Sequence, residues 1–190
     1  MKTAFIGLDY IFDIVHPDGK LSRSSGPVLE RSVLAKANRA LHISHDKGWL
    51  TALVKVGFAP GYVNQPKNSP FFGGTQKAGA LELGTKGTEF HPDLNADLAD
   101  VIVVKPRVSA FYGTDLESVL RPNKIERLIV AGVSTAWAVQ ATARDAHDRD
   151  YEVIIAEDAC AAASEEEHGT SMKLLSQIAK VIKVEDLASL

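Results

Sequence analysis

Three positions in the sequence follow apolar runs and carry groups that could act together in a reaction. Asp9 follows the run from Thr3, Lys105 ends the run from Val101, and the turn at 132–135 follows a third run. An aspartic acid beside a lysine can give or take a proton, because the lysine charge lowers its pKa while burial raises it. A helix that starts after a turn presents free backbone N–H groups, which can hold an anion or oxyanion. The residue types therefore indicate acid–base chemistry with electrostatic stabilisation of a charged intermediate.

These groups meet only if the apolar runs are neighbouring parallel strands. The sequence alternates such runs with segments of helical period, of which the stripe at Val33, Leu34, Ala37, Ala40 and Leu41 is one. The expected strands are Thr3–Leu8, Trp49–Val56, Val101–Val104, Arg127–Ala131, Glu152–Ala156 and Val181–Val184; the other expected helices are 115–120, a segment beginning at 135, and 164–178. This alternation predicts a single α/β domain over residues 1–190. We expect an open six-stranded parallel sheet with helices on both faces and a site at the carboxyl ends of its strands.

Residues 57–90 interrupt the alternation with glycines, prolines and several aromatic side chains. A connection of this length without a period is usually functional or mobile. We expect it to form a wall or lid of the site, and the aromatic residues Phe58, Tyr62, Phe71, Phe72 and Phe90 argue against a disordered insertion.

Composition narrows the class of protein. The chain has 190 residues, a formal net charge of -3 and one cysteine. Without a basic block we expect no nucleic acid and no anionic membrane as partner. Cys160 has no second cysteine to pair with, which predicts a reducing cytoplasm and excludes a cysteine metal cluster. No apolar run is long enough to span a membrane, so we expect a cytoplasmic protein.

The segment from Gly132 to Ala146, Gly-Val-Ser-Thr-x-x-Ala-Val-x-x-Thr-Ala-Arg-Asp-Ala, resembles the signature of the isochorismatase-like hydrolases. This family, within the cysteine hydrolase superfamily, includes nicotinamidases and N-carbamoylsarcosine amidase. In most members a cysteine nucleophile occupies the position of Ala138, so this chain resembles the branch in which a small residue replaces it. The resemblance extends over nearly the whole chain, from Asp9 through Lys105 to Glu157-Asp-Ala-Cys-Ala161.

The resemblance implies roles for individual residues. Asp9 and Lys105 match the two residues that complete a triad with the cysteine, and the bond matching Val133–Ser134 is a cis peptide. The amides matching Ser134 and Ala138 form the oxyanion hole. Relatives usually form homodimers or larger homo-oligomers, and we expect the same here.

A methyl group at position 138 changes the chemistry that can be expected. Loss of a triad nucleophile lowers turnover on the order of a millionfold, which disfavours an amidase that forms an acyl-enzyme. Isochorismatases themselves lack the cysteine and cleave a vinyl ether, a reaction that needs only an acid, a water molecule and an electrostatic clamp. We therefore expect a hydrolase of a small metabolite that favours C–O over amide C–N bonds, with Asp9 as general acid or base and Lys105 as its partner.

Other residues have more open roles. Phe111, Tyr112 and Trp137 are candidates for the wall of a substrate pocket, and a place in the core is an equally good interpretation of each. Arg107, two residues from Lys105, is expected to bind a substrate carboxylate. We expect no cofactor and no metal, because the one Asp-x-His spacing, at 145–147, lies on a helix where positions two apart do not share a face.

Three alternatives stay open at this level. The chain could be a non-catalytic descendant of the family that binds or senses a small molecule. It could also be a cysteine amidase in which Ala138 is an engineered replacement. Cys160, which also follows a strand, is a candidate for a displaced nucleophile, although a buried cysteine usually behaves as a small hydrophobic residue.

Overall fold

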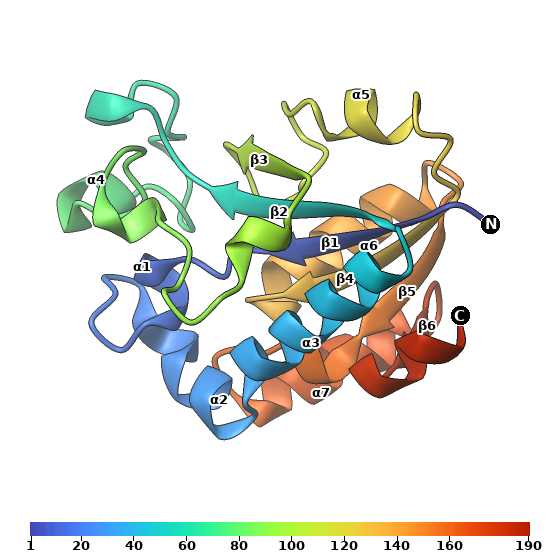
Figure 1. Cartoon of the computed structure of the whole chain (residues 1–190). Helices are drawn as coiled ribbons and strands as arrows, with labels where there is room; N and C mark the ends of the chain where they lie inside the picture. The colour runs from blue at the N-terminus through green and yellow to red at the C-terminus, as the bar shows by residue number, and fades with distance from the viewer.

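Six parallel strands in the order β3-β2-β1-β4-β5-β6 form one sheet in the computed structural model, which describes all 190 residues. The strands are β1 (Thr3–Leu8), β2 (Leu50–Val56), β3 (Val101–Lys105), β4 (Arg127–Gly132), β5 (Glu152–Ala156) and β6 (Lys180–Ile182). The predicted α/β class and the six-stranded parallel sheet are confirmed. The carboxyl ends of the strands point to the left in Figure 1, and both chain termini lie at the other end of the sheet.

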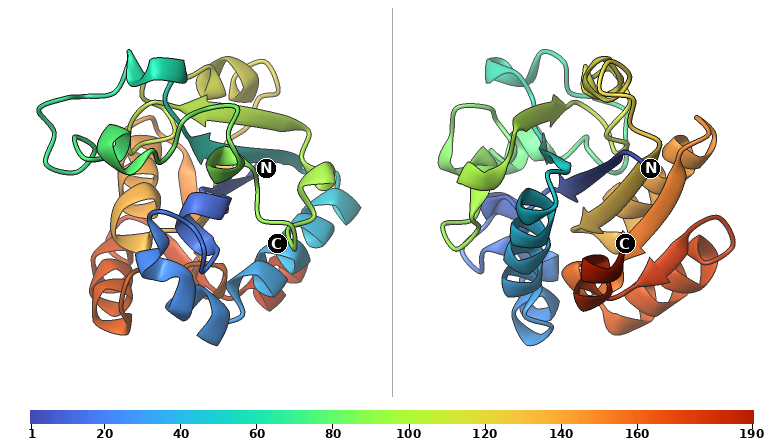
Figure 2. Two further views of the ribbon diagram at one scale, coloured as in Figure 1. Left: turned by 90° about the vertical axis from the view of Figure 1, so that its left-hand side faces the viewer. Right: turned by 45° about the vertical axis from the view of Figure 1, so that its right-hand side comes forward.

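Central strands are buried along their length because helices cover both faces of the sheet. Every residue of β1 is buried, which explains its uninterrupted apolar sequence. From β1 the chain moves to β2 on one side, whereas from β4 it moves to β5 on the other. Right-handed crossovers in opposite directions put the connecting helices on opposite faces. Thus α3 (Val33–Asp46) packs on β1 and β2, and α6 (Gln140–His147) packs on β4 and β5 from the opposite side (Figure 2).

Local signals explain where the longer helices begin and end. Helix α3 stops before Gly48, whose φ of 62° is the left-handed conformation common just after a helix. In α7 (Glu165–Leu175), the Ser164 hydroxyl accepts a hydrogen bond from the Glu167 amide at 3.2 Å. Acidic residues fill the first turn of α7, where the helix dipole favours negative charge. The remaining helices are short: α1 (Phe12–Val15), α2 (Ser25–Glu30), α4 (Thr75–Ala78) and α5 (Leu116–Leu120).

Two expectations about elements were wrong in detail. Strand β6 ends at Ile182 rather than Val184, because Val184 already begins a short helical turn packed into the core. The segment between β1 and Pro27, for which no helix was predicted, contains α1, and α2 already begins there at Ser25. None of the helices is both long enough and apolar enough to cross a lipid bilayer.

The segment 57–90 packs around a small core of its own beside the carboxyl ends of the strands (Figure 1). Its anchor is the buried carboxylate of Asp13, which accepts hydrogen bonds from the Leu81 amide at 2.8 Å and the Lys20 amide at 3.2 Å. The core consists of Ile11, Val56, Phe58, Tyr62, Phe72, Ala80 and Leu81. The aromatic residues therefore hold this long connection against the end of the sheet.

Candidate functional site

Asp9 and Lys105 form a buried ion pair at the carboxyl ends of β1 and β3. Lys105 Nζ lies 2.7 Å from Asp9 Oδ2, and the two side chains are 1% and 4% exposed. The pair has further partners, because Asp9 Oδ1 accepts from the Val56 amide at 2.7 Å and Lys105 Nζ donates to the Val108 carbonyl at 2.7 Å. Removing either partner would leave an uncompensated charge in the interior.

The backbone at Asp9 directs this side chain. Asp9 has φ 56°, in the left-handed region that non-glycine residues rarely adopt, and its amide donates to the Val54 carbonyl at 2.8 Å. The chain therefore leaves β1 in a sharp turn while staying bonded to β2. Unfavourable backbone conformations of this kind concentrate at functional sites.

Burial raises the pKa of the Asp9 carboxyl above its ordinary value, although the Lys105 charge and the hydrogen bonds from Lys105 and Val56 lower it in part. The raised pKa favours the protonated carboxyl, which is the form able to donate a proton. The ammonium of Lys105 remains beside it to stabilise the carboxylate left after proton transfer.

The turn after β4 forms the second half of the site. A Cβ at Gly132 would collide with the Leu8 carbonyl, so glycine is required where β4 passes β1. The Val133–Ser134 peptide bond is cis, and residues Thr135–Val139 form one π-helical turn that leads into α6. The methyl group of Ala138 lies in this turn and is almost fully buried.

Ser134 carries polar groups without partners in the protein. Its amide donates no hydrogen bond, and its hydroxyl oxygen is buried without a donor or acceptor nearby. The carbonyl of the same residue accepts from the Trp137 and Val139 amides, each at 3.2 Å. Buried polar groups are normally paired, so an unpaired amide and hydroxyl at one residue indicate a place where a ligand or water is held.

Hydrogen bonds from Thr135 hold the turn after β4 in place. The Thr135 amide donates to the Ala161 carbonyl at 2.8 Å, and the Thr135 hydroxyl lies 2.9 Å from His168 Nδ1. His168 Nε2 lies 3.0 Å from the guanidinium of Arg31. Burial, with help from the Arg31 charge, lowers the pKa of His168, which favours the neutral ring that can accept from Arg31.

A cavity of about 320 Å³ joins the ion pair to the turn. Asp9, Lys105, Val133, Ser134 and Ala138 all line it. The residues predicted from three distant parts of the sequence therefore do converge at one hollow. Its other lining residues are mainly apolar, and they include Pro70, Phe71 and Phe72 from the 57–90 segment and Trp137 from the π-helical turn.

The structure does not bring every candidate substrate-binding residue to this cavity. Arg107 donates to the carbonyls of Pro106 and Asn64, and its guanidinium lies 5.8 Å from the ring of the exposed Tyr112. Phe111 is buried beside Tyr151, with ring centroids 6.1 Å apart, so it belongs to the core. Of the three aromatic candidates only Trp137 lines the cavity.

Cys160 is also outside the cavity. It is fully buried, and burial raises the pKa of its thiol to about 12. A thiol with this pKa remains protonated and is a poor nucleophile. No group of three or more histidine, cysteine, aspartate or glutamate side chains is arranged to hold a metal ion.

Residues from the segment after α1 complete the cavity, and none of them was predicted from the sequence. Arg23 and Ser24 line it, and so does Glu167 from the first turn of α7. The Arg23 and Glu167 side chains approach to 4.0 Å at its mouth. The one feature that could have indicated these residues is their place in the chain. They follow β1, where the strand order changes direction and ligands usually bind.

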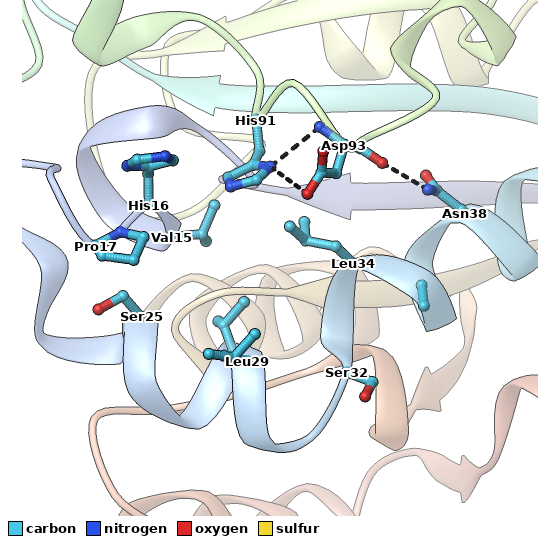
Figure 3. A pocket seen from close by; sticks show the side chains of 12 residues that line it. Val15, His16, Pro17, Ser25, Leu29, Ser32, Leu34, Asn38, His91 and Asp93 are labelled. Atoms are coloured by element: carbon cyan, nitrogen blue, oxygen red, sulfur yellow. Dashed lines mark hydrogen bonds and ion pairs between the residues drawn. The ribbon is translucent and has the colours of Figure 1, made fainter.

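A second hollow, of about 490 Å³, lies beside α2 and the start of α3 (Figure 3). The tripeptide His-Pro-Asp occurs twice, at 16–18 and 91–93, and we call these the His-Pro-Asp turns. Both histidines line the hollow, together with Pro17 and Asp93. In each turn the aspartate amide donates to the histidine Nδ1 at 3.1 Å, so Nδ1 is the acceptor of the turn's hydrogen bond. The two rings lie 5.3 Å apart.

Comparison with known proteins supports the resemblance seen in the sequence. The model of the isochorismatase domain matches residues 3–186. The isochorismatase family protein YecD of Escherichia coli O157:H7 is 33% identical over 174 residues, which cover 90% of this chain and 89% of that protein. The ureidoacrylate amidohydrolase RutB of Methylorubrum extorquens is 33% identical over 144 residues, which cover 72% of this chain but 58% of that protein.

The fold is shared with a solved structure as well. The pyrazinamidase/nicotinamidase of Streptococcus mutans UA159 superposes with a TM-score of 0.82 at 25% identity, covering 95% of this chain and 100% of that one. From the matched domain, the relatives and the common fold, this chain belongs to the isochorismatase family of hydrolases.

Proposed function

We propose that the chain is a hydrolase of a small metabolite that works without a cysteine nucleophile. In this proposal Asp9 is the general acid, Lys105 is its electrostatic partner, and the amides of Ser134 and Ala138 bind an oxygen of the substrate. One observation carries it: a buried, lysine-paired carboxyl with a raised pKa faces the same cavity as a methyl group at position 138.

Hydrolysis of a vinyl ether or a related C–O bond fits these groups best. The protonated Asp9 donates its proton to the terminal carbon of the enol ether, and the ether carbon becomes an oxocarbenium ion. Water then adds to that carbon, and the resulting hemiketal breaks into a carbonyl compound and an alcohol. Lys105 stabilises the Asp9 carboxylate until it regains a proton from the water that added.

The matching test is a screen of enol ethers and amides with the wild-type protein and with Asp9→Asn. We expect turnover of an enol ether that falls about 10²- to 10⁴-fold in the variant, the usual contribution of a general acid. Turnover that is unchanged by Asp9→Asn would remove the mechanism. Ligands that raise the melting temperature with no product formed would instead favour a non-catalytic binding role.

A cysteine amidase with alanine at the nucleophile position is the second candidate. It is favoured by the amidohydrolase and nicotinamidase among the similar proteins and by the place of Ala138 in the first turn after β4. Under this alternative, Ala138→Cys creates amidase activity and is alkylated by iodoacetamide far faster than the wild type, whose only cysteine is buried. Absence of both gains would exclude it.

We also propose that the 57–90 segment is a wall of the substrate site, since Pro70, Phe71 and Phe72 border the cavity.

For the assembly we propose a homo-oligomer, as expected from the family resemblance. The exposed side chains of Ile102 and Val104 on the edge strand β3 support this proposal, because paired subunits would cover them. Light scattering of Val104→Glu should then give a smaller particle than the wild type.

A further inference from the structure

Arg23 is the cation on the cavity wall that is free to meet an anion. The other cation there, Lys105, is engaged by Asp9 and by the Val108 carbonyl. The Arg23 side chain is 83% exposed, and its single charged neighbour is Glu167 at 4.0 Å, the outer limit of an ion pair. A planar guanidinium presents paired N–H donors that match the two oxygens of a carboxylate.

The next residue, Ser24, supplies a second unpaired donor. Ser24 is 5% exposed and lines the cavity, and its hydroxyl makes no hydrogen bond within the protein. This hydroxyl is not sealed inside the protein but is open to the cavity, so a ligand there can accept its hydrogen bond in place of water. Arg23 and Ser24 are adjacent in the chain and border one cavity, and together they offer donors for one oxyanion.

The rest of the wall suits a flat, unsaturated body. The rings of Phe71 and Trp137 lie 4.7 Å apart at the rim, and Ile14, Leu21 and Val108 add apolar surface. A volume of about 320 Å³ lies at the lower end of the range for small-molecule sites. The cavity therefore accepts a small molecule with one planar apolar part.

The charged side chains of the cavity indicate what charge the bound molecule should carry. Asp9 and Lys105 compensate each other, so Arg23 is left as the one cation that an anion can approach, and the nearby Glu167 disfavours additional negative charge. We propose that Arg23 and Ser24 form a carboxylate-binding subsite and that the substrates are small, planar monocarboxylates. The identification of this cavity as the substrate site rests on the proposed function.

The test measures binding of benzoate and of benzamide, which have nearly the same shape but differ by one charge. By calorimetry we expect the wild type to bind benzoate about fivefold more tightly than benzamide, the upper range for an exposed ion pair. Arg23→Gln should abolish the difference, whereas Glu167→Gln should enlarge it by freeing Arg23. Arg39→Gln, a change of an exposed arginine outside the cavity, should leave the preference intact.

Three results would overturn the inference: equal binding of benzoate and benzamide to the wild type, a preference that survives Arg23→Gln, or tighter binding of inorganic phosphate than of benzoate. Because the readout is binding, the same titrations in Asp9→Asn separate the two proposals. A retained benzoate preference beside unaffected turnover would remove the hydrolytic mechanism alone, and turnover restricted to uncharged substrates would remove the carboxylate subsite alone.

Discussion

Two hollows of this molecule, the cavity at the strand ends and the one beside α2, give their titratable side chains different partners. In the cavity at the strand ends, Asp9 is paired with a second buried side chain, Lys105. In the larger hollow beside α2, the histidines of the two His-Pro-Asp turns bond to backbone amides through Nδ1. Burial raises the pKa of Asp9 and lowers that of His91, so both groups are shifted toward their neutral forms.

This difference in chemistry, rather than the size of the hollows, is the reason for proposing the smaller one as the reactive site. The larger hollow uses its polar atoms to stabilise turns, whereas the smaller one keeps an unpaired amide and hydroxyl at Ser134 next to an acid with a charged partner. A group that can change charge during a reaction needs such a partner, since an isolated buried charge is strongly unfavourable.

Turnover should separate the two regions most sharply. We expect Asp9→Asn to lower the rate about 10²- to 10⁴-fold, because the proton donor is lost. His91→Gln should leave the rate within about twofold of wild type, because it removes a turn contact and no reacting group. Steady-state kinetics on the substrate found by screening measures both, and equal losses would mean that the hollows do not differ in function.

The next largest effect concerns stability. Lys105→Met leaves the Asp9 carboxyl without its charged partner, and we expect a loss of about 3–5 kcal/mol in the free energy of unfolding at neutral pH. Urea denaturation measures this loss. The double change Asp9→Asn with Lys105→Met should recover more than half of it, and a single-variant loss below about 1 kcal/mol would mean that the buried pair is weak.

The two regions should also respond to pH with opposite signs. Because the folded pKa of Asp9 is above its ordinary 3.8, its contribution to stability is present below that value and is lost as pH rises through the folded pKa. Because the folded pKa of His91 is below its ordinary 6.5, its contribution is present above that value and is lost as pH falls through the folded pKa.

Unfolding free energies measured across pH should show this in the variants. Relative to wild type, Asp9→Asn should flatten the decline on the alkaline side of 3.8, and His91→Gln should flatten the decline on the acid side of 6.5. A change of the same sign in both variants would contradict the comparison.

The smallest expected effect is on the stability of the second hollow itself. His91→Gln removes the bond between Nδ1 and the Asp93 amide, and we expect a loss of about 0.5–1.5 kcal/mol at neutral pH. Urea denaturation at constant pH measures this loss in the free energy of unfolding. Since the equivalent His16 bond remains, a loss as large as that of Lys105→Met would show that the turns support the whole end of the sheet.

Residues at the ends of buried strands were predictable, because topology alone brings them together. The apolar runs predicted β1, β3 and β4. Because the carboxyl ends of parallel strands lie at the same edge of a sheet, Asp9, Lys105 and the Ala138 turn were expected at one cavity, where the structure places them. Their catalytic roles stay predictions.

Residues without a periodic pattern were not predictable from the sequence. Arg107 is close to Lys105 along the chain, but its guanidinium is engaged by carbonyls outside the cavity. Arg23 is far from both predicted groups and reaches the cavity only because short helices fold the segment after β1 back over the strand ends. Sequence distance is therefore a poor guide to the cavity wall, which depends on how these irregular segments pack.

The protonation of Asp9 is the most direct test of the account. NMR of protein labelled with ¹³C at the aspartate carboxyl carbons, with the Asp9 signal assigned by its loss in Asp9→Asn, follows this one group as pH changes. We expect the Asp9 signal to titrate above the ordinary value of 3.8. Titration at or below that value would mean that Asp9 stays ionised beside Lys105 and is not the acid of the reaction.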